Sequence, residues 1–297
     1  MATIFQWRDP QRKADIFSDD AQRELASWNN ARLEPRLPDD EWRERLETDR
    51  AMLEIEGDFL EQLRTEVKGE VARVPTVPNA FIAWFEALER DGPGQHDPLF
   101  DWLAAEADLE QLRWYLTQEA AGEAGFEDLT AYTQVKLPDR VKLELARNYW
   151  DEMGRGNIKG MHGPMLGRLV AALGLNPTIG GTVWESLALA NAMTAMATRR
   201  DYAWHAVGAL GVIELTAPAR SAAVAAGLKR LGLPAKDRLY FDLHAVLDVK
   251  HSEAWNAEAI LPAVADDPAR ARAIAEGALI RLNCGARCFE RYRSELW

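Results

Sequence analysis

The sequence predicts an all-α protein, a bundle of helices preceded by a helical extension at the amino terminus. Runs rich in Ala, Leu, Glu and Arg carry apolar residues at spacings of three and four, which is the period of an amphipathic helix. No segment alternates convincingly between apolar and polar residues, and no Asn-Gly or Asp-Gly turn lies between strand-like segments. Hydrophobic residues make up 47% of the 297 residues, enough for a full core.

Capping residues and prolines predict where the first helices begin and end. Ser18-Asp19-Asp20 starts one helix, and Pro38-Asp39-Asp40 starts a longer one that runs towards Gly69. The sequence Val74-Pro75-Thr76-Val77-Pro78 then breaks the chain. A further helical segment follows at 81–90.

The rest of the chain is divided in the same way. The loop 91–94 separates an accessory helical region, 1–92, from the core bundle, 93–297. Gly232-Leu233-Pro234 lies between two helices, and Asp267-Pro268 opens the last one. We expect the accessory region to pack on the core, because its helix carries an apolar stripe that needs covering: Trp42, Leu46, Leu53, Phe59 and Leu63.

Composition and charge exclude several classes of partner. The net charge of -12 and the pI of about 5.0 disfavour binding to nucleic acid or to an acidic membrane. No run of about 18 apolar residues indicates a membrane span, and the first residues lack the pattern of a signal peptide. We therefore expect a cytoplasmic protein. Cys284 and Cys288, four residues apart, are interpreted as free thiols on the terminal helix.

A triplet of polar residues near the carboxyl end indicates a metal site. His244, Asp248 and His251 lie at offsets of zero, four and seven, so a helix places them on one face. Imidazole and carboxylate together suit iron or manganese. Ala245, Val246, Leu247 and Val249 between them are apolar, which favours burial, and buried polar groups need a partner or a metal. The alternative is a polar stripe on a half-exposed helix.

A second candidate pair is Glu152 and His162, ten residues apart. They would not share a face of one ideal helix. Gly154, Gly156 and Gly160 lie between them, so we expect the helix to unwind and both side chains to reach one site. We also expect Ala at Gly154 and Gly156 to raise metal retention by stiffening a mobile segment. The alternative is a helix end in which His162 lies near a cap.

Two more carboxylates complete the candidate set. Glu214 is the one acidic residue in the apolar stretch 204–218, where a bridging role between two metals explains it better than exposure. His205, on the same stretch, is expected to be a structural histidine. Glu119 is the candidate first ligand, although Glu123 one turn later competes with it and both are compatible with a solvated helix surface.

The candidate residues follow one another in a recognisable order: Glu119, Glu152, His162, Glu214, His244, Asp248 and His251. Over about residues 100 to 260 this order resembles the haem-oxygenase-like diiron oxidases, or iron-containing redox enzymes. The final His-x3-Asp-x2-His and the Trp-Asp-Glu-x-Gly-x-Gly segment with its later His carry the resemblance. It implies a haem-oxygenase-like bundle without haem, in which these residues ligate two Fe²⁺ ions.

The charges agree with two metals, since four carboxylates offset the four positive charges of two divalent ions. The resemblance implies an oxygenase of biosynthesis that uses O2, an external electron donor and a peroxo-diferric intermediate, in a chain that forms a homodimer. N-oxygenation of an amine or amino acid is slightly favoured over C–C cleavage or desaturation of a fatty acid or amino acid. No catalytic residue is expected beyond the metal ligands.

Three other classes of protein are alternatives to a diiron oxygenase. A ferritin-like diiron bundle requires Glu-x-x-His, which the sequence lacks. A haem oxygenase requires one axial His in an apolar pocket, where a ring of carboxylates has no place. A non-catalytic metal-binding helical protein stays open, and the reaction with O2 distinguishes it.

Overall fold

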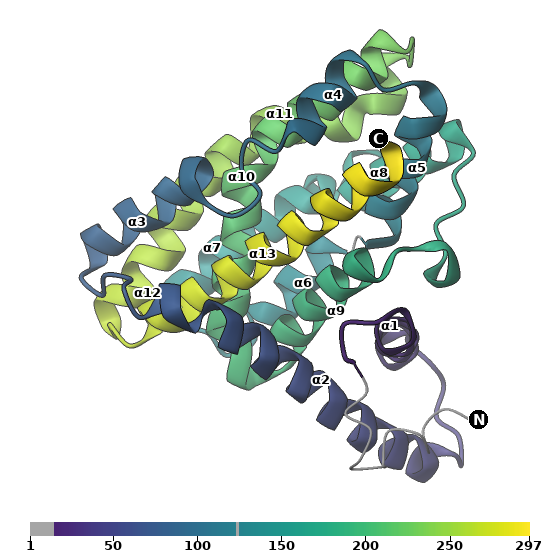
Figure 1. Ribbon diagram of the computed structural model, residues 1–297. Helices are drawn as coiled ribbons and strands as arrows, with labels where there is room; N and C mark the ends of the chain where they lie inside the picture. The colour runs from purple at the N-terminus through teal and green to yellow at the C-terminus, as the bar shows by residue number, and fades with distance from the viewer. Residues whose placement is uncertain (1–14, 123–124) are drawn as a thin grey trace.

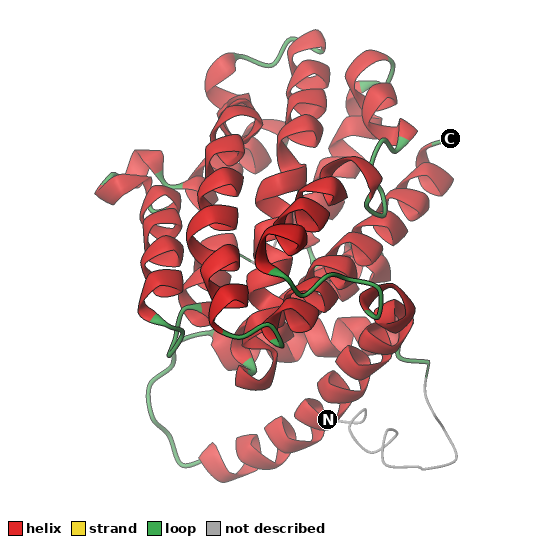
Figure 2. Cartoon of the chain, turned by 90° about the vertical axis from the view of Figure 1, so that its left-hand side faces the viewer, coloured by secondary structure: helices red, strands yellow, loops and turns green. Residues whose placement is uncertain are grey.

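Helix α10 (Ala203–Arg230) forms the centre of the bundle in the computed structural model, which describes residues 15–122 and 125–297. It packs along α11 (Ala235–Ala254) and α13 (Arg270–Leu296), and α13 crosses the front of the molecule in Figure 1. Within the described ranges the chain forms helices and loops and no strand (Figure 2). The prediction of an all-α fold is confirmed.

The remaining helices surround these three. The other α-helices of the described residues are α1 (Asp19–Leu33), α2 (Trp42–Val71), α3 (Pro78–Asp91), α4 (Pro98–Ala105), α5 (Leu109–Gly122), α6 (Phe126–Thr133), α7 (Asp139–Glu152), α8 (His162–Leu173), α9 (Trp184–Thr198) and α12 (Leu261–Asp266). Short 3₁₀ turns and one π-helical turn connect some of them: η1 (Gly154–Gly156), η2 (Ile158–Gly160), η3 (Ile179–Gly181), η4 (Arg200–Tyr202) and η5 (Trp255–Ile260).

Helix ends follow the capping signals. Ser18 caps α1, and its Oγ accepts a hydrogen bond from the Ala21 amide at 3.4 Å. Helix α2 begins shortly after Pro38, and α13 begins just after Asp267-Pro268. Gly232 adopts φ +86 between α10 and α11, a conformation that favours glycine. The predicted boundaries are therefore correct to within a few residues.

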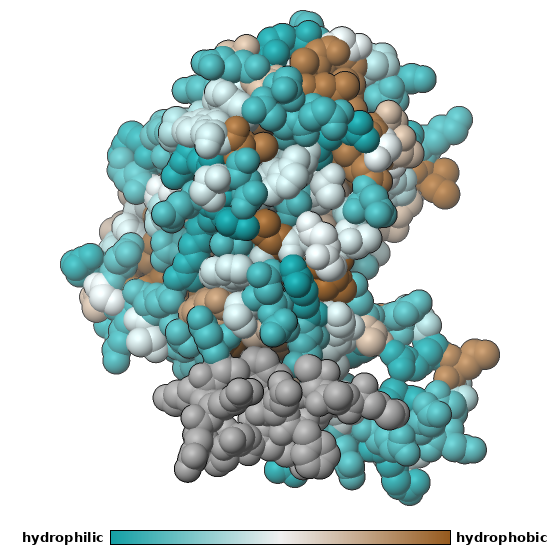
Figure 3. Space-filling view, turned by 45° about the vertical axis from the view of Figure 1, so that its right-hand side comes forward, coloured by the Kyte–Doolittle hydropathy of each residue, from teal (hydrophilic) through white to brown (hydrophobic). Residues whose placement is uncertain are grey.

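The apolar character of α10 follows from its position. Residues 200–230 are long and apolar enough, by length and composition, to cross a membrane. However, 61% of the most apolar window is buried inside the protein. Neighbouring helices cover this segment on several sides, which accounts for its composition. By contrast, the face in Figure 3 is mostly hydrophilic, with apolar residues in small separate groups.

Helices α1 to α3 share an apolar core with the rest of the bundle, in which Phe59 and Phe85 join Leu210 and Ile274. The expectation that the whole stripe on α2 is covered was wrong, however. Phe59 and Leu63 are 0% and 1% exposed, whereas Trp42 and Leu46 are 50% and 59% exposed. The reason is length, because a helix of 30 residues extends past the core and projects from the bundle (Figure 1).

A buried ion pair fastens α2 to the helices beside it. The Glu56 side chain is 0% exposed and lies 2.9 Å from Arg32 and 3.5 Å from Arg199. We expect Glu56→Ala to lower the free energy of unfolding by about 3 kcal/mol, because it leaves two partly buried guanidinium groups unpaired. Urea unfolding measures this, with the exposed Glu54→Ala as the control. Equal unfolding of the two variants would contradict the role of Glu56.

Candidate metal centre

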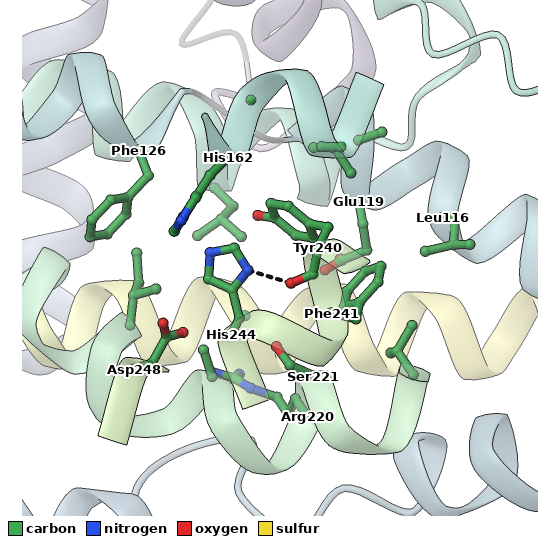
Figure 4. A pocket seen from close by; sticks show the side chains of 18 of the residues that line it. Leu116, Glu119, Phe126, His162, Arg220, Ser221, Tyr240, Phe241, His244 and Asp248 are labelled. Atoms are coloured by element: carbon green, nitrogen blue, oxygen red, sulfur yellow. Dashed lines mark hydrogen bonds between the residues drawn. The ribbon is translucent and has the colours of Figure 1, made fainter. Parts of the chain in front are cut away.

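Six of the seven candidate residues line one cavity of about 220 Å³ inside the bundle, and His251 is not among its lining residues. Helices α4 to α11 and α13 contribute to its walls, which are largely apolar. His162, His244 and Asp248 converge on one part of it (Figure 4). Glu152 and Glu214 line the same cavity.

A tight turn brings Glu152 and His162 together. Glu152 is the last residue of α7 and His162 the first of α8. Between them, Met153 and Met161 pair as an isolated antiparallel bridge, so the chain returns on itself. His162 Nδ1 consequently lies 2.7 Å from Glu152 Oε2, and both side chains are buried. The expected unwinding is confirmed.

Gly154 makes this turn possible. Its φ is +59, and a Cβ added to it would lie 2.4 Å from the carbonyl carbon of Gly160. An alanine would strain the backbone, and it would push apart the two chain segments that meet in the turn. The expectation that Ala at this position raises metal retention is therefore wrong, because the glycine here allows a close backbone contact.

We expect Gly154→Ala to lower the free energy of unfolding by about 2 kcal/mol and to reduce metal retention, since Glu152 and His162 move apart. Gly167→Ala is the matched control. It lies on α8, and an added Cβ meets no atom within 4 Å, so it should stabilise the helix by about 1 kcal/mol. Unfolding curves and metal content after desalting measure both effects. Unchanged metal content in Gly154→Ala would contradict this account of the turn.

The His244 ring is held in one orientation. Its Nδ1 donates to the carbonyl oxygen of Tyr240 at 2.6 Å, which leaves Nε2 as the nitrogen available to a metal. The rings of His244 and His162 lie 4.7 Å apart. Burial and the neighbouring His162 lower the pKa of His244 to about 4, so the imidazole is neutral, as a metal ligand must be.

His251 faces the carboxylate of Glu214 from the next turns of α11. Its Nε2 bonds Asp151 Oδ2 at 3.2 Å, and its Nδ1 lies 3.4 Å from Glu214 Oε2. Asn148 donates to the other oxygen of Glu214 at 2.5 Å. Burial alone would lower the pKa of His251. The Glu214 and Asp151 carboxylates have the larger effect, and the pKa of His251 is raised to about 9.

Asp248 is buried between the two histidines of α11, with 3% of its surface exposed. Burial, followed by the charges of Glu214 and Glu152, raises its pKa to about 10. Burial also raises the pKa of Glu152. Several carboxylates that disfavour one another's charge are typical of a site that receives a cation.

Two groups of residues in the described chain could each hold a metal ion. Potential ligand atoms of Glu152, His162 and His244 all lie within 4.8 Å of one another, as do those of Glu152, Glu214 and His251. Glu152 belongs to both groups. Among the described residues, the buried atoms His162 Nδ1, Asp248 Oδ1 and His251 Nδ1 form no well-aligned hydrogen bond. The two histidine nitrogens do lie near carboxylate oxygens, at 2.7 and 3.4 Å. Buried ligand atoms of this kind on α8 and α11 are what a bound metal would satisfy.

Glu119 lies apart from the two groups, and Asp248, although it lines the same cavity, is also in neither. Glu119 Oε1 accepts a hydrogen bond from Tyr292 Oη at 2.9 Å, and in the view of Figure 4 Glu119 is on the opposite side of Tyr240 from His162. It still lines the cavity, and its role as a ligand stays a prediction. The competing Glu123 lies outside the described residues. His205, interpreted as structural, bonds Glu276 at 2.8 Å on another face of α10.

Sequence reasoning missed three polar neighbours of the centre. Asn148 and Asp151 lie on α7. Asn148 is four residues before Glu152, a helical spacing that could have identified it, whereas Asp151 is directly before Glu152 and does not share its face. Glu127 lines the cavity from α6, and a Cβ added to Gly163 would lie 2.9 Å from its Oε1. No periodicity connects Glu127 to the other candidates, because α6 is a separate short helix.

Solved structures share the fold. A CADD-like protein of unknown function from Nostoc punctiforme matches with a TM-score of 0.57 and 18% identity, over 74% of this chain and 98% of that one. A domain of unknown function with a haem-oxygenase-like fold from Shewanella denitrificans matches with a TM-score of 0.52 and 16% identity, over 78% and 92%. No curated protein matches the chain significantly.

The family comparison covers the helices that carry the centre. Residues 113–286 match the model described as "Iron-containing redox enzyme". This range is more than half of the chain, and it contains all seven candidate ligands. The protein, with its haem-oxygenase-like fold, therefore belongs to the family of iron-containing redox enzymes.

Proposed function

We propose that the protein is a non-haem diiron oxygenase or oxidase that uses O2 to oxidise a small organic substrate. The observation that supports this most is the position of Glu152, which is common to two groups of buried or half-buried carboxylate and imidazole side chains beside one cavity. N-oxygenation of an amine or amino acid is the favoured reaction. C–C cleavage or desaturation of a fatty acid or amino acid is the alternative.

Two bound Fe²⁺ ions would supply the electrons with which O2 is first reduced, and an external donor would restore them. The chain's own residues prepare the site for them. The Tyr240 carbonyl orients His244, and Asp151 orients His251. The Asn148 amide holds one oxygen of Glu214. The apolar walls of the cavity exclude water from the substrate.

Anaerobic loading with Fe²⁺, followed by stopped-flow mixing with O2, tests the proposal. Binding of two irons per chain and a transient visible absorption after mixing would support it. Mass spectrometry with candidate amines and amino acids then separates N-oxygenated products from alkenes or cleaved products. Bound iron without any O2-dependent absorption, also with candidate substrates present, would indicate a non-catalytic metal-binding protein. Failure to bind iron would contradict the proposal altogether.

A further inference from the structure

Two arginine side chains line the cavity that also contains the metal ligands. Arg220 belongs to α10 and Arg281 to α13, two helices that pack along each other. Figure 4 shows Arg220 beside Ser221 on α10, below His244 in that view. The apolar part of the wall contacts Arg220 through Phe289, whose ring centre lies 5.5 Å from the guanidinium carbon, but it offers neither arginine a negative charge.

Neither arginine forms an ion pair within the described part of the chain. Arg220 uses Nε and Nη2 on its own helix, where they donate to the carbonyl oxygen of Thr216 at 3.0 Å and to its Oγ1 at 2.5 Å. Arg281 Nε is buried and has no hydrogen-bond partner. No carboxylate of residues 15–122 or 125–297 lies within 4.0 Å of either guanidinium group.

Two like charges in a buried place are unfavourable without an anion. Burial, followed by the charge of Arg281, lowers the pKa of Arg220 to about 10, so it is still a cation at neutral pH. The acid whose charge acts on Arg220 is Glu119. Its oxygen Oε1 is already engaged by Tyr292. For Arg220, the described chain therefore provides one nearby carboxylate, against the charge of a second guanidinium group.

We propose that Arg220 and Arg281 bind the carboxylate of a small monoanionic substrate. The apolar body of the substrate extends along the wall formed by Leu116, Leu169, Phe241 and Phe289. Its reactive end then faces His244 and Asp248. That the bound molecule is the substrate rests on the proposed function. The anion site itself can be tested without iron.

Charge and size favour a carboxylate over a phosphate group. A guanidinium group forms paired hydrogen bonds with either anion. A carboxylate requires less positive charge than a phosphate monoester, which carries close to two negative charges at neutral pH. The cavity, at about 220 Å³, is below the roughly 300–1,000 Å³ of pockets for drug-sized ligands. A short carboxylic acid therefore fits better than a large phosphorylated molecule.

Calorimetric titration of the full-length protein tests the site with three probes of equal chain length: octanoate, octyl phosphate and octanol. The protein is used both metal-free and loaded with Zn²⁺, which cannot perform redox chemistry. Wild type is compared with Arg220→Gln, Arg281→Gln and Arg281→Lys. Arg272→Gln is the control, because Arg272 is exposed on the same helix as Arg281. Unfolding curves identify any variant that is misfolded.

We expect octanoate to bind wild type, with or without Zn²⁺, more tightly than octanol or octyl phosphate. Either Gln variant should weaken octanoate binding by at least about tenfold, as loss of a charged hydrogen bond does. Arg281→Lys should restore part of it, and Arg272→Gln should change nothing. Tighter binding of octyl phosphate, binding that requires Zn²⁺, or Gln variants equal to wild type would overturn the inference. A failed O2 reaction with intact octanoate binding would instead refute only the proposed function.

Discussion

Glu152→Gln is expected to remove both metal ions at once, whereas His244→Ala and His251→Ala should each remove one. Glu152 is the residue that the two ligand groups share, while His244 and His251 belong to one group each. A glutamine keeps the shape of the side chain but removes the charge that both ions need. Loss of a residue that only hydrogen-bonds a metal ligand typically lowers activity by roughly 10–100-fold. Loss of Glu152, which would bind the ions itself, should lower activity by more than this.

Iron content after anaerobic loading and desalting measures this directly, together with calorimetric titration with Mn²⁺. Glu290→Gln is the matched control, because Glu290 is exposed on α13 and should leave the stoichiometry unchanged. Retention of two ions by Glu152→Gln would show that Glu152 only positions His162, with which it pairs at 2.7 Å. A single ion in wild type would contradict the assignment of two groups.

The helix α11 explains why part of the centre was predictable. His244, Asp248 and His251 lie on one element, so the helical period alone puts them on one face. Glu214 was predictable for another reason, since one acid in an apolar helix at the centre of a bundle requires a partner. In both cases the evidence lies within one helix: the helical spacing for α11, and the single acid among apolar residues for α10.

Other features depend on how separate elements meet, which no local pattern records. The glycines indicated that the chain unwinds after Glu152, but they gave no sign that Gly154 lies against Gly160. Glu119 has the same helical surroundings as many solvated glutamates, and only the fold places Tyr292 beside it. Similarly, the stripe on α2 predicts burial but not that the helix extends beyond its neighbours.

Asp248→Asn is expected to abolish metal binding and yet stabilise the metal-free protein by about 1–2 kcal/mol at neutral pH. Asp248 has its pKa raised to about 10 by burial and by the Glu214 and Glu152 charges. In the unfolded chain the same carboxyl ionises near its ordinary pKa of about 3.9. The folded protein therefore binds the extra proton, and the stability of the metal-free form falls as pH rises between these two values.

Asparagine has no proton to lose, so the variant should show a weaker loss of stability on going from pH 5 to pH 8. Metal uptake by wild type should release the proton of Asp248, and its affinity should rise with pH. Asp242→Asn is the control on the same helix, because Asp242 is 37% exposed and pairs with Arg238, a contact worth no more than about 1 kcal/mol. If the metal-free Asp248→Asn protein is destabilised and still binds metal, Asp248 is a structural hydrogen-bond acceptor. The metal would then be bound by the other carboxylates. Stabilisation with loss of metal would mean that the fold tolerates a buried acid here for the sake of the ion it binds.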